Sequence, residues 1–299
     1  MIDFKPISLQ DKKIYENYLF KEDEHCCNYS FANLFMWGEQ STAILQEHFL
    51  IFTHFKKMQV YPYPLGNGDK KTVIDAIIAD AKERGIPCKI TVMGEAQKAE
   101  LEQLYPGKFT FYGDRDSSDY VYAIDDLADL KGRKYHRKKN HYNGFKKSYP
   151  DATVEPLTKH LLPQVKEMTD NWFLNKLTQN PDGDYEMEKI ALSRALTHYE
   201  ELEMEGLVLL DGNEILAVTL GSRMSENTFD VHFEKARPDA QGAYAAINCE
   251  FARYIRTKYP QIQFLNREED LGIEGLRKAK ESYLPHHMVE KYQAWLNEN

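Results

Sequence analysis

One order of predicted elements occurs twice along this chain, and the repetition constrains the fold more than any single motif. In the first half, two helices precede β-like runs and a glycine turn, after which helices and strands alternate. The predicted segments are helices at residues 9–20 and 29–37, strands at 42–46, 48–55 and 58–63, the turn 64–69, a helix at 70–84, a strand at 89–93, a helix at 95–105, and strands at 108–112 and 120–124.

The second half repeats that order. Its predicted segments are helices at 157–177 and 187–199, a hairpin of 207–210 and 215–220, a strand at 228–234, the turn 241–243 with a helix to 258, a strand at 262–265, a helix at 273–282 and an extended piece at 288–295. The order predicts an α/β (α+β) protein with mixed sheets flanked by helices. We expect an N-terminal domain at 1–128, a basic junction segment at 129–150 and a C-terminal domain at 151–299.

The junction contains a basic run, residues 131–147, with eight Lys/Arg, two His and no acidic residue. The rest of the chain is acidic, with 30 Lys+Arg against 47 Asp+Glu. A solvated basic face is the alternative interpretation. Because Tyr, Asn and Phe are interleaved among the basic residues, we expect an anionic ligand there.

Other features narrow the class of protein. The N-terminus has no apolar segment typical of an export signal, and nowhere do about 18 apolar residues run together, so a membrane span is not expected. The cysteines Cys26, Cys27, Cys88 and Cys249 form neither a metal-binding pair nor a disulfide framework. We therefore expect a cytoplasmic globular protein without a metal.

The element order resembles the GNAT acyltransferase fold. A closer resemblance is to the phosphatidylglycerol lysyltransferase C-terminal domain family. It rests on NYSFANLFMW from Asn28, LKGRKYHRKKNHYNGFKK from Leu130, HFEKARPDAQGAYAAINCEFA from His232 and FLNREEDLGIEGLRKAKESYLP from Phe264. It covers most of the chain and implies a tandem GNAT fold related to enzymes whose donor is aminoacyl-tRNA. Without a membrane-embedded portion, a phosphatidylglycerol acceptor is not implied.

Acyl transfer to an amine needs a base for the amine proton and an acid for the leaving group. His232 and Glu234 alternate along a strand, so we expect both on one face of the sheet. Glu268 and Glu269 follow another strand at its carboxyl end, where ligands bind in open α/β sheets; capping of the next helix is the alternative. Tyr283 is a candidate leaving-group acid, although packing before a proline also explains it.

The donor site is expected at the second glycine turn and the basic run. A helix N-terminus with glycine suits a pyrophosphate, and basic side chains suit further phosphates. The candidate cofactor-binding residues are Gln241, Gly242, Ala243 and Tyr244 at the turn, and Arg133, Lys134, Arg137, Lys138 and Asn143 in the basic run. The corresponding turn at 65–69 is a weaker candidate because Asp69 would repel a phosphate, and for both turns the backbone requirement for glycine is the alternative.

These residues serve either of two donors. Acyl-coenzyme A would bind through its phosphates, whereas tRNA would also stack unpaired bases on Tyr135 and Tyr142. The net charge of −9 favours the smaller polyanion, so we expect an acyltransferase that moves an acyl or aminoacyl group from acyl-coenzyme A to a small-molecule or peptide amine. The alternatives are an aminoacyl-tRNA-dependent aminoacyltransferase and a non-catalytic module that binds nucleotide or nucleic acid.

Overall fold

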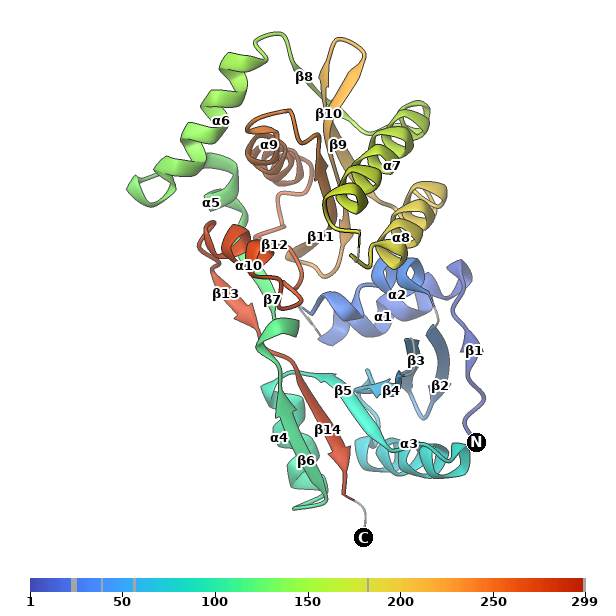
Figure 1. Cartoon of the computed structure of the whole chain (residues 1–299). Coiled ribbons are helices and arrows are strands. Elements are labelled where there is room, and N and C mark those ends of the chain that lie inside the picture. The colour runs from blue at the N-terminus through green and yellow to red at the C-terminus, as the bar shows by residue number, and fades with distance from the viewer. Residues whose placement is uncertain (23–25, 39, 56–57, 182, 298–299) are drawn as a thin grey trace. The chain divides into compact units, whose positions relative to one another are not determined.

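The computed structural model describes residues 1–22, 26–38, 40–55, 58–181 and 183–297 (Figure 1). They form two compact units, each with its own sheet. The first unit contains residues 1–119, 269–274 and 288–299, and the second contains residues 120–268 and 275–287. Both units are therefore assembled from segments that are distant in the sequence.

The first unit is a mixed sheet with helices. Its elements are β1 (Lys5–Pro6), α1 (Lys12–Glu22), α2 (Phe31–Trp37), β2 (Gln40–Leu45), β3 (His48–Phe55), β4 (Met58–Pro62), α3 (Lys70–Arg84), β5 (Lys89–Met93), α4 (Glu95–Leu104), β6 (Phe109–Gly113) and β14 (Tyr292–Leu296). The strand order is β1-β2-β3-β4-β5-β14-β6. The pair β4–β5 is parallel, and β14 pairs antiparallel with both neighbours.

Helix α3 shows how local sequence sets an element here. The Asp69 side chain accepts a hydrogen bond from the Lys71 main-chain N–H, and Gly85 ends the helix in the left-handed conformation. A Cβ atom on Gly66 would lie 2.2 Å from the Glu47 carbonyl oxygen. The glycine of this turn is therefore required because the β2–β3 turn approaches it closely.

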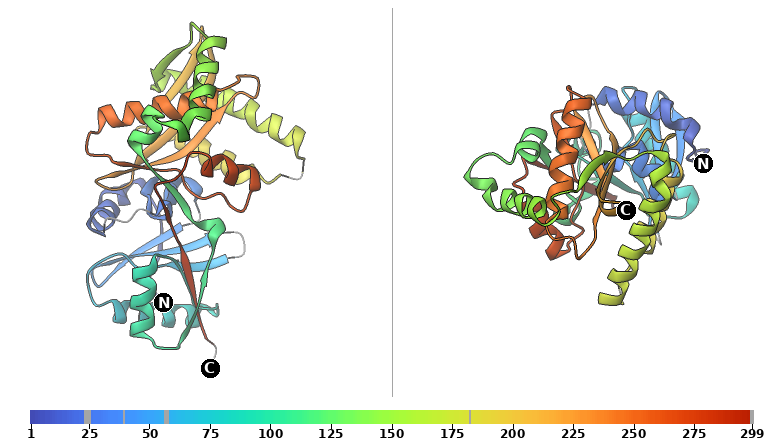
Figure 2. Two further views of the ribbon diagram at one scale, coloured as in Figure 1. Left: turned by 90° about the vertical axis from the view of Figure 1, so that its left-hand side faces the viewer. Right: turned by 90° about the horizontal axis from the view of Figure 1, so that it is seen from above.

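The second unit is a larger mixed sheet. Its elements are β7 (Asp119–Ala123), α5 (Ile124–Asp129), α6 (His136–Ser148), β8 (Thr153–Pro156), α7 (Leu162–Gln179), α8 (Glu186–Thr197), β9 (Glu205–Asp211), β10 (Glu214–Arg223), β11 (Thr228–Ala236), α9 (Ala243–Lys258), β12 (Phe264–Asn266), α10 (Glu274–Glu281) and β13 (His287–Val289). The strand order is β13-β7-β12-β11-β10-β9-β8. Helix α9 lies on one face of the sheet, and α7 and α8 lie on the other (Figures 1 and 2).

Strand β11 separates from its neighbour β12 part of the way along. The parallel pairing covers Thr228–Phe264, Phe229–Leu265 and Asp230–Asn266, and it ends there. The remaining residues of β11 pair with β10 alone. This fork is the place where candidate functional side chains from β11 and from the segment after β12 meet.

The α/β prediction with two mixed sheets is confirmed, but the units are not continuous in sequence as 1–128 and 151–299 would be. The predicted extended piece at 288–295 contains β14, which completes the first sheet, and β7 belongs to the second. The basic run covers the approach to helix α6 and nearly all of that helix, which packs on α9 within the second unit. Its tyrosines Tyr135 and Tyr142 are buried by this packing, so they are not exposed for stacking on bases.

Candidate functional site

A β-bulge in β11 determines how the fork is lined. Leu220 and Gly221 are consecutive on β10, yet they pair with Phe233 and Val231, so His232 is the extra residue. Beyond a bulge, side chains change faces relative to strict alternation. His232 therefore lies on the α7–α8 face, and Glu234 lies on the α9 face with Asn248 as its partner. The expectation that His232 and Glu234 share one face is wrong for this reason.

On the α7–α8 face, His232 connects a hydroxyl with two carboxylates. Its Nε2 lies 2.8 Å from the Ser222 Oγ, and its Nδ1 lies 3.2 Å from a Glu268 oxygen and 3.5 Å from an Asp230 oxygen. Ionised carboxylates only accept hydrogen bonds, so we assign the proton of neutral His232 to Nδ1. Nε2 then accepts the hydrogen bond that the Ser222 hydroxyl donates.

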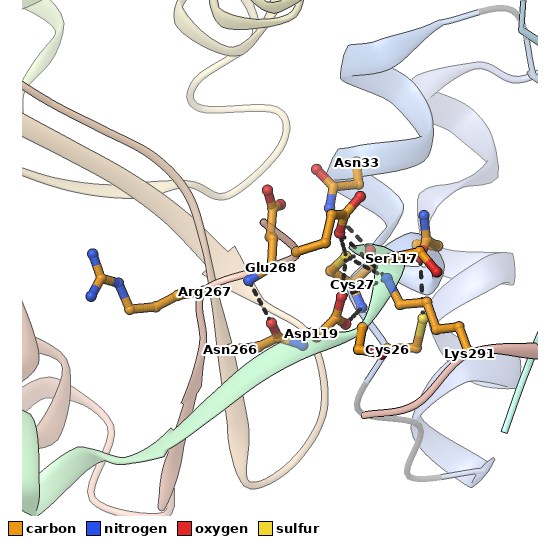
Figure 3. A network of polar contacts seen from close by, with 12 residues as sticks. Cys26, Cys27, Asn33, Ser117, Asp119, Asn266, Arg267, Glu268 and Lys291 are labelled. Atoms are coloured by element: carbon orange, nitrogen blue, oxygen red, sulfur yellow. Dashed lines mark hydrogen bonds and ion pairs between the residues drawn. The ribbon is translucent and has the colours of Figure 1, made fainter. Parts of the chain in front are cut away.

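Glu268 is the partly exposed member of this group, and its backbone conformation is unusual. Its φ of +58° lies in the left-handed region, which residues other than glycine adopt rarely. The Asn266 side chain accepts a hydrogen bond from the Glu268 N–H at 2.8 Å (Figure 3). The Lys280 ammonium donates to the Glu268 carbonyl at 3.1 Å. Such a conformation, held from both sides, is typical of functional positions.

The same group could hold a metal ion. One ligand atom from each of Asp230, His232 and Glu268 lies within 4.8 Å of the others. A divalent cation would have to replace the Nδ1 proton of His232, because a ring nitrogen cannot carry a proton and ligate a metal together.

On the α9 face, Glu234 forms a partly buried ion pair. One of its oxygens accepts from Arg267 Nη2 at 3.0 Å, and the other accepts from Asn248 Nδ2 at 3.2 Å. Arg267 and Glu268 follow each other in the chain and their side chains diverge, as Figure 3 shows. The segment after β12 thus supplies a cation to one face and a carboxylate to the other.

Two further predicted residues, Tyr283 and Lys138, meet beside Arg267. The Lys138 Nζ lies 3.7 Å from the centroid of the Tyr283 ring, and the guanidinium carbon of Arg267 lies 5.1 Å from it. Burial raises the pKa of Tyr283 above its ordinary value, so its hydroxyl keeps its proton at neutral pH.

The glycine turn before α9 lies against α6. Gly242 has a φ of +82°, and a Cβ on it would lie 2.5 Å from the carbonyl oxygen of His141 in α6. Ala243 is buried and Gln241 is exposed. Tyr244 is partly exposed and accepts a hydrogen bond from the Trp172 ring N–H at 3.1 Å. A binding role for these four turn residues stays a prediction.

Most basic side chains of the run are exposed. Arg133 precedes α6, and Arg137 and Asn143 lie on its exposed side. Lys134 forms an ion pair with Asp126 at 3.4 Å. Only Lys138 of this set reaches the Arg267 region, and a donor-binding role for the others stays a prediction.

The structure places Glu269 with Lys291, Asp119 and Cys27, in a cluster of the first unit whose other three members are labelled in Figure 3. The Lys291 ammonium lies 3.3 Å from Glu269 and also pairs with Asp119, and the Cys27 N–H donates to Asp119 at 2.7 Å. Although burial disfavours the charged lysine, Asp119 and the neighbouring acids raise its pKa well above the ordinary value. The Lys291 ammonium thus neutralises the carboxylates of Asp119 and Glu269, which together with Cys27 could otherwise hold a metal ion. Glu269 and Glu268 lie five and six residues before Glu274, the first residue of α10, too far away to cap that helix.

Sequence reasoning missed four polar residues around the fork, Ser222, Asp230, Asn248 and Asn266. Only one signal pointed to them. Gly221 directly follows the predicted strand 215–220, and a glycine within a strand, as the longer β10 makes it, often marks a bulge. A Cβ on Gly221 would lie 2.3 Å from the Asp230 carbonyl oxygen, so the glycine permits the close strand approach.

The two mixed sheets with flanking helices, and the fork beyond a bulged strand, define a tandem GNAT-like fold. A tandem GNAT protein from the clavulanic acid biosynthesis pathway shares it, with 6% identity and a TM-score of 0.52 over 100% of both chains. The chain belongs to the family described as phosphatidylglycerol lysyltransferase, C-terminal, whose model matches residues 21–295. The family is thus one of aminoacyl-transferring proteins.

Individual relatives cover most of the chain. A conserved protein of unknown function from Bacteroides thetaiotaomicron VPI-5482 is 38% identical, with a TM-score of 0.94 over 99% of this chain and 100% of that one. L-PGS from Bacillus licheniformis is 16% identical, with a TM-score of 0.69 over 97% and 93%. Among curated proteins, the uncharacterized protein MYCGA3080 of Mycoplasmoides gallisepticum is 22% identical over 59% of this chain and 55% of its own length, so the match spans about half of that relative.

Among the described residues, no helix is both long and apolar enough to cross a membrane.

Proposed function

We propose that the protein is an aminoacyltransferase that takes an aminoacyl group from aminoacyl-tRNA and passes it to an acceptor amine. Family membership and the tandem GNAT-like fold support aminoacyl transfer. The choice of aminoacyl-tRNA as donor goes beyond what family and fold support. It also differs from the sequence-based prediction, in which the net charge favours acyl-coenzyme A.

The observation that carries the choice of donor is the packing of α6 against Gly242. A pyrophosphate at a helix N-terminus needs an open approach to main-chain N–H groups. Here the Ala243 N–H already donates to the Ala240 carbonyl at 3.1 Å, and the His141 carbonyl oxygen closes one side of the turn at Gly242, where even a methyl group would not fit. An electronegative carbonyl beside this turn disfavours a pyrophosphate, and a donor that binds elsewhere is the better match.

The reaction follows from the group on the α7–α8 face. The acceptor nitrogen attacks the ester carbonyl carbon, the bond to the terminal ribose oxygen breaks, and Glu268 takes the proton that the amine loses. His232 donates to Glu268 from Nδ1 and orients it, and Ser222 fixes the ring through Nε2. The ribose oxygen leaves with a proton that the site returns to it.

A transfer assay tests the proposal. Purified protein is incubated with labelled aminoacyl-tRNA or labelled acetyl-coenzyme A and a panel of amines, and amide products are measured. We expect aminoacyl products, and we expect Glu268→Gln to lower the single-turnover rate about 100-fold or more, with little change in tRNA binding.

Glu281→Gln, which changes an exposed carboxylate of α10, is the matched control and should keep the full rate. Products from acetyl-coenzyme A alone would contradict the proposed donor. A normal single-turnover rate for Glu268→Gln would exclude Glu268 as the base.

A further inference from the structure

Two cations of the second unit, Lys138 and Arg267, lie at one aromatic ring. The ammonium of Lys138 is 3.7 Å from the Tyr283 ring centroid, and the guanidinium carbon of Arg267 is 5.1 Å from the same point. Arg267 also lies 5.7 Å from the ring centroid of Tyr122. Aromatic faces attract cations, but they carry no net charge with which to neutralise them.

The carboxylates near Lys138 and Arg267 carry too little negative charge to neutralise both cations. Glu234 pairs with Arg267 Nη2, and its other oxygen is taken by Asn248. The second terminal nitrogen of Arg267, Nη1, is buried and has no hydrogen-bond partner within the described ranges. Across the same ranges, no carboxylate forms an ion pair with Lys138. Two cations therefore share one carboxylate.

Such an arrangement is unfavourable without a further anion. A buried donor that lacks a partner costs free energy, and neighbouring like charges repel each other. Burial lowers the pKa of Lys138 to about 8, and the charge of Arg267 acts in the same direction. Uncompensated positive charge beside a partly exposed lysine is the electrostatic pattern of an anion site.

We propose that Lys138 and Arg267, with the ring of Tyr283 as a wall, bind a phosphate group of the donor's terminal nucleotides. This identification of the phosphate rests on the proposed function. Arg267 Nη1 would donate to one phosphate oxygen and Lys138 to another, which gives both cations an anionic partner. The exposed basic side chains of α6 lead to this place and would attract a polyanion.

The role of Tyr283 differs here from that of a leaving-group acid. Its ring contacts both cations, and its pKa is raised by burial, so it presents an uncharged aromatic surface.

Replacing Lys138 alone tests the site, because Arg267 is needed to neutralise partly buried Glu234. Thermal unfolding of the intact protein is measured for Lys138→Met without ligand, with inorganic phosphate, with coenzyme A, and with the trinucleotide CCA. We expect the ligand-free variant to melt at a higher temperature than the natural protein, because the repulsion with Arg267 is gone. We expect its affinity for CCA to fall about tenfold.

The matched control is Lys139→Met, which removes an exposed charge from the adjacent position of α6. It should retain CCA binding within about twofold. Equal losses in the two variants would indicate diffuse attraction and overturn the site, and so would a lower melting temperature of ligand-free Lys138→Met, which a structural ion pair would produce.

Binding and transfer separate the two proposals. If CCA binds through Lys138 but no aminoacyl product forms from aminoacyl-tRNA, the function fails and the phosphate site stands. If Lys138→Met transfers from aminoacyl-tRNA with an unchanged KM, the site fails and the function stands. Coenzyme A that binds more tightly than CCA, with the same dependence on Lys138, would confirm the phosphate site and contradict the tRNA donor.

Discussion

At the scale of single residues, Glu268 combines a strained backbone conformation with a proposed role in proton transfer. A glutamate with a φ of +58° costs about 1–3 kcal/mol relative to relaxed backbone. Asn266 and Lys280 offset that cost through hydrogen bonds to the main chain on both sides of the residue. The carboxylate therefore has a defined direction before any substrate binds, which its proposed role as general base requires.

Lys291 is a second residue whose role is decided by its partners. We expect Lys291→Met to destabilise the protein by about 3–5 kcal/mol, because Asp119 would be left as a buried, unpaired charge. The pKa of Lys291 is raised, so its stabilising contribution is complete at neutral pH and is lost only as the pH rises above the ordinary lysine range.

Urea unfolding at pH 7 measures this difference in the free energy of unfolding. Lys108→Met removes an exposed lysine of the same unit and should change the free energy by less than about 0.5 kcal/mol. Similar values for both variants would contradict a buried charge cluster.

At the scale of elements, the local sequence predicted helices and strands better than it predicted the faces on which the site residues lie. The helix at 70–84 and the strand at 89–93 were predicted with their observed bounds, because capping residues and β-branched runs mark them directly. The faces of His232 and Glu234 were not, since alternation assumes an unbroken ladder. The bulge depends on how β10 and β11 pair, and only Gly221 hinted at it.

The packing of α6 on α9 gives a prediction at this scale. We expect Gly242→Ala to destabilise the protein by about 2 kcal/mol or more, because alanine disfavours a φ of +82° and its methyl group would collide with the His141 carbonyl. Denaturant unfolding provides the measurement.

Gly85→Ala is a control with a φ of +70° in the same left-handed region and no atom within 4 Å of the added Cβ. The control should lower the free energy of unfolding only by the cost of placing alanine in a left-handed backbone conformation, about 1 kcal/mol. If the two variants were equally destabilised, the close approach of α6 would contribute nothing.

At the scale of the whole molecule, the repeated element order predicted two similar sheets but not their exact membership. Residues 292–296 complete the first sheet although they come from the far end of the chain. Strand pairing between distant segments depends on which edge is open, and neither propensity nor periodicity reports that. The Lys138–Arg267–Tyr283 group escaped prediction for the same reason, since its members come from three distant segments.

The charge of the chain leads to a final prediction. The protein carries a net charge of −9, so attraction to RNA must come from few contacts. The proposed site holds one phosphate, so we expect the affinity for the CCA trinucleotide to fall with salt at a logarithmic slope of about −0.7. Titration by fluorescence anisotropy at several salt concentrations measures the slope, and Lys138→Met should make it shallower. A slope unchanged by that substitution would mean that Lys138 does not contact a phosphate.

Arg267 and Glu268 are joined by one peptide unit, yet they serve opposite faces of the sheet. The number of residues between the end of β12 and this pair is therefore as constrained as the identity of the two residues. One residue inserted after Asn266 would shift both residues relative to β12 and away from their partners Glu234 and His232. Length variation, which surface loops ordinarily tolerate, is thus excluded at this point, and any chain that keeps the site must keep the count of residues that leads into it.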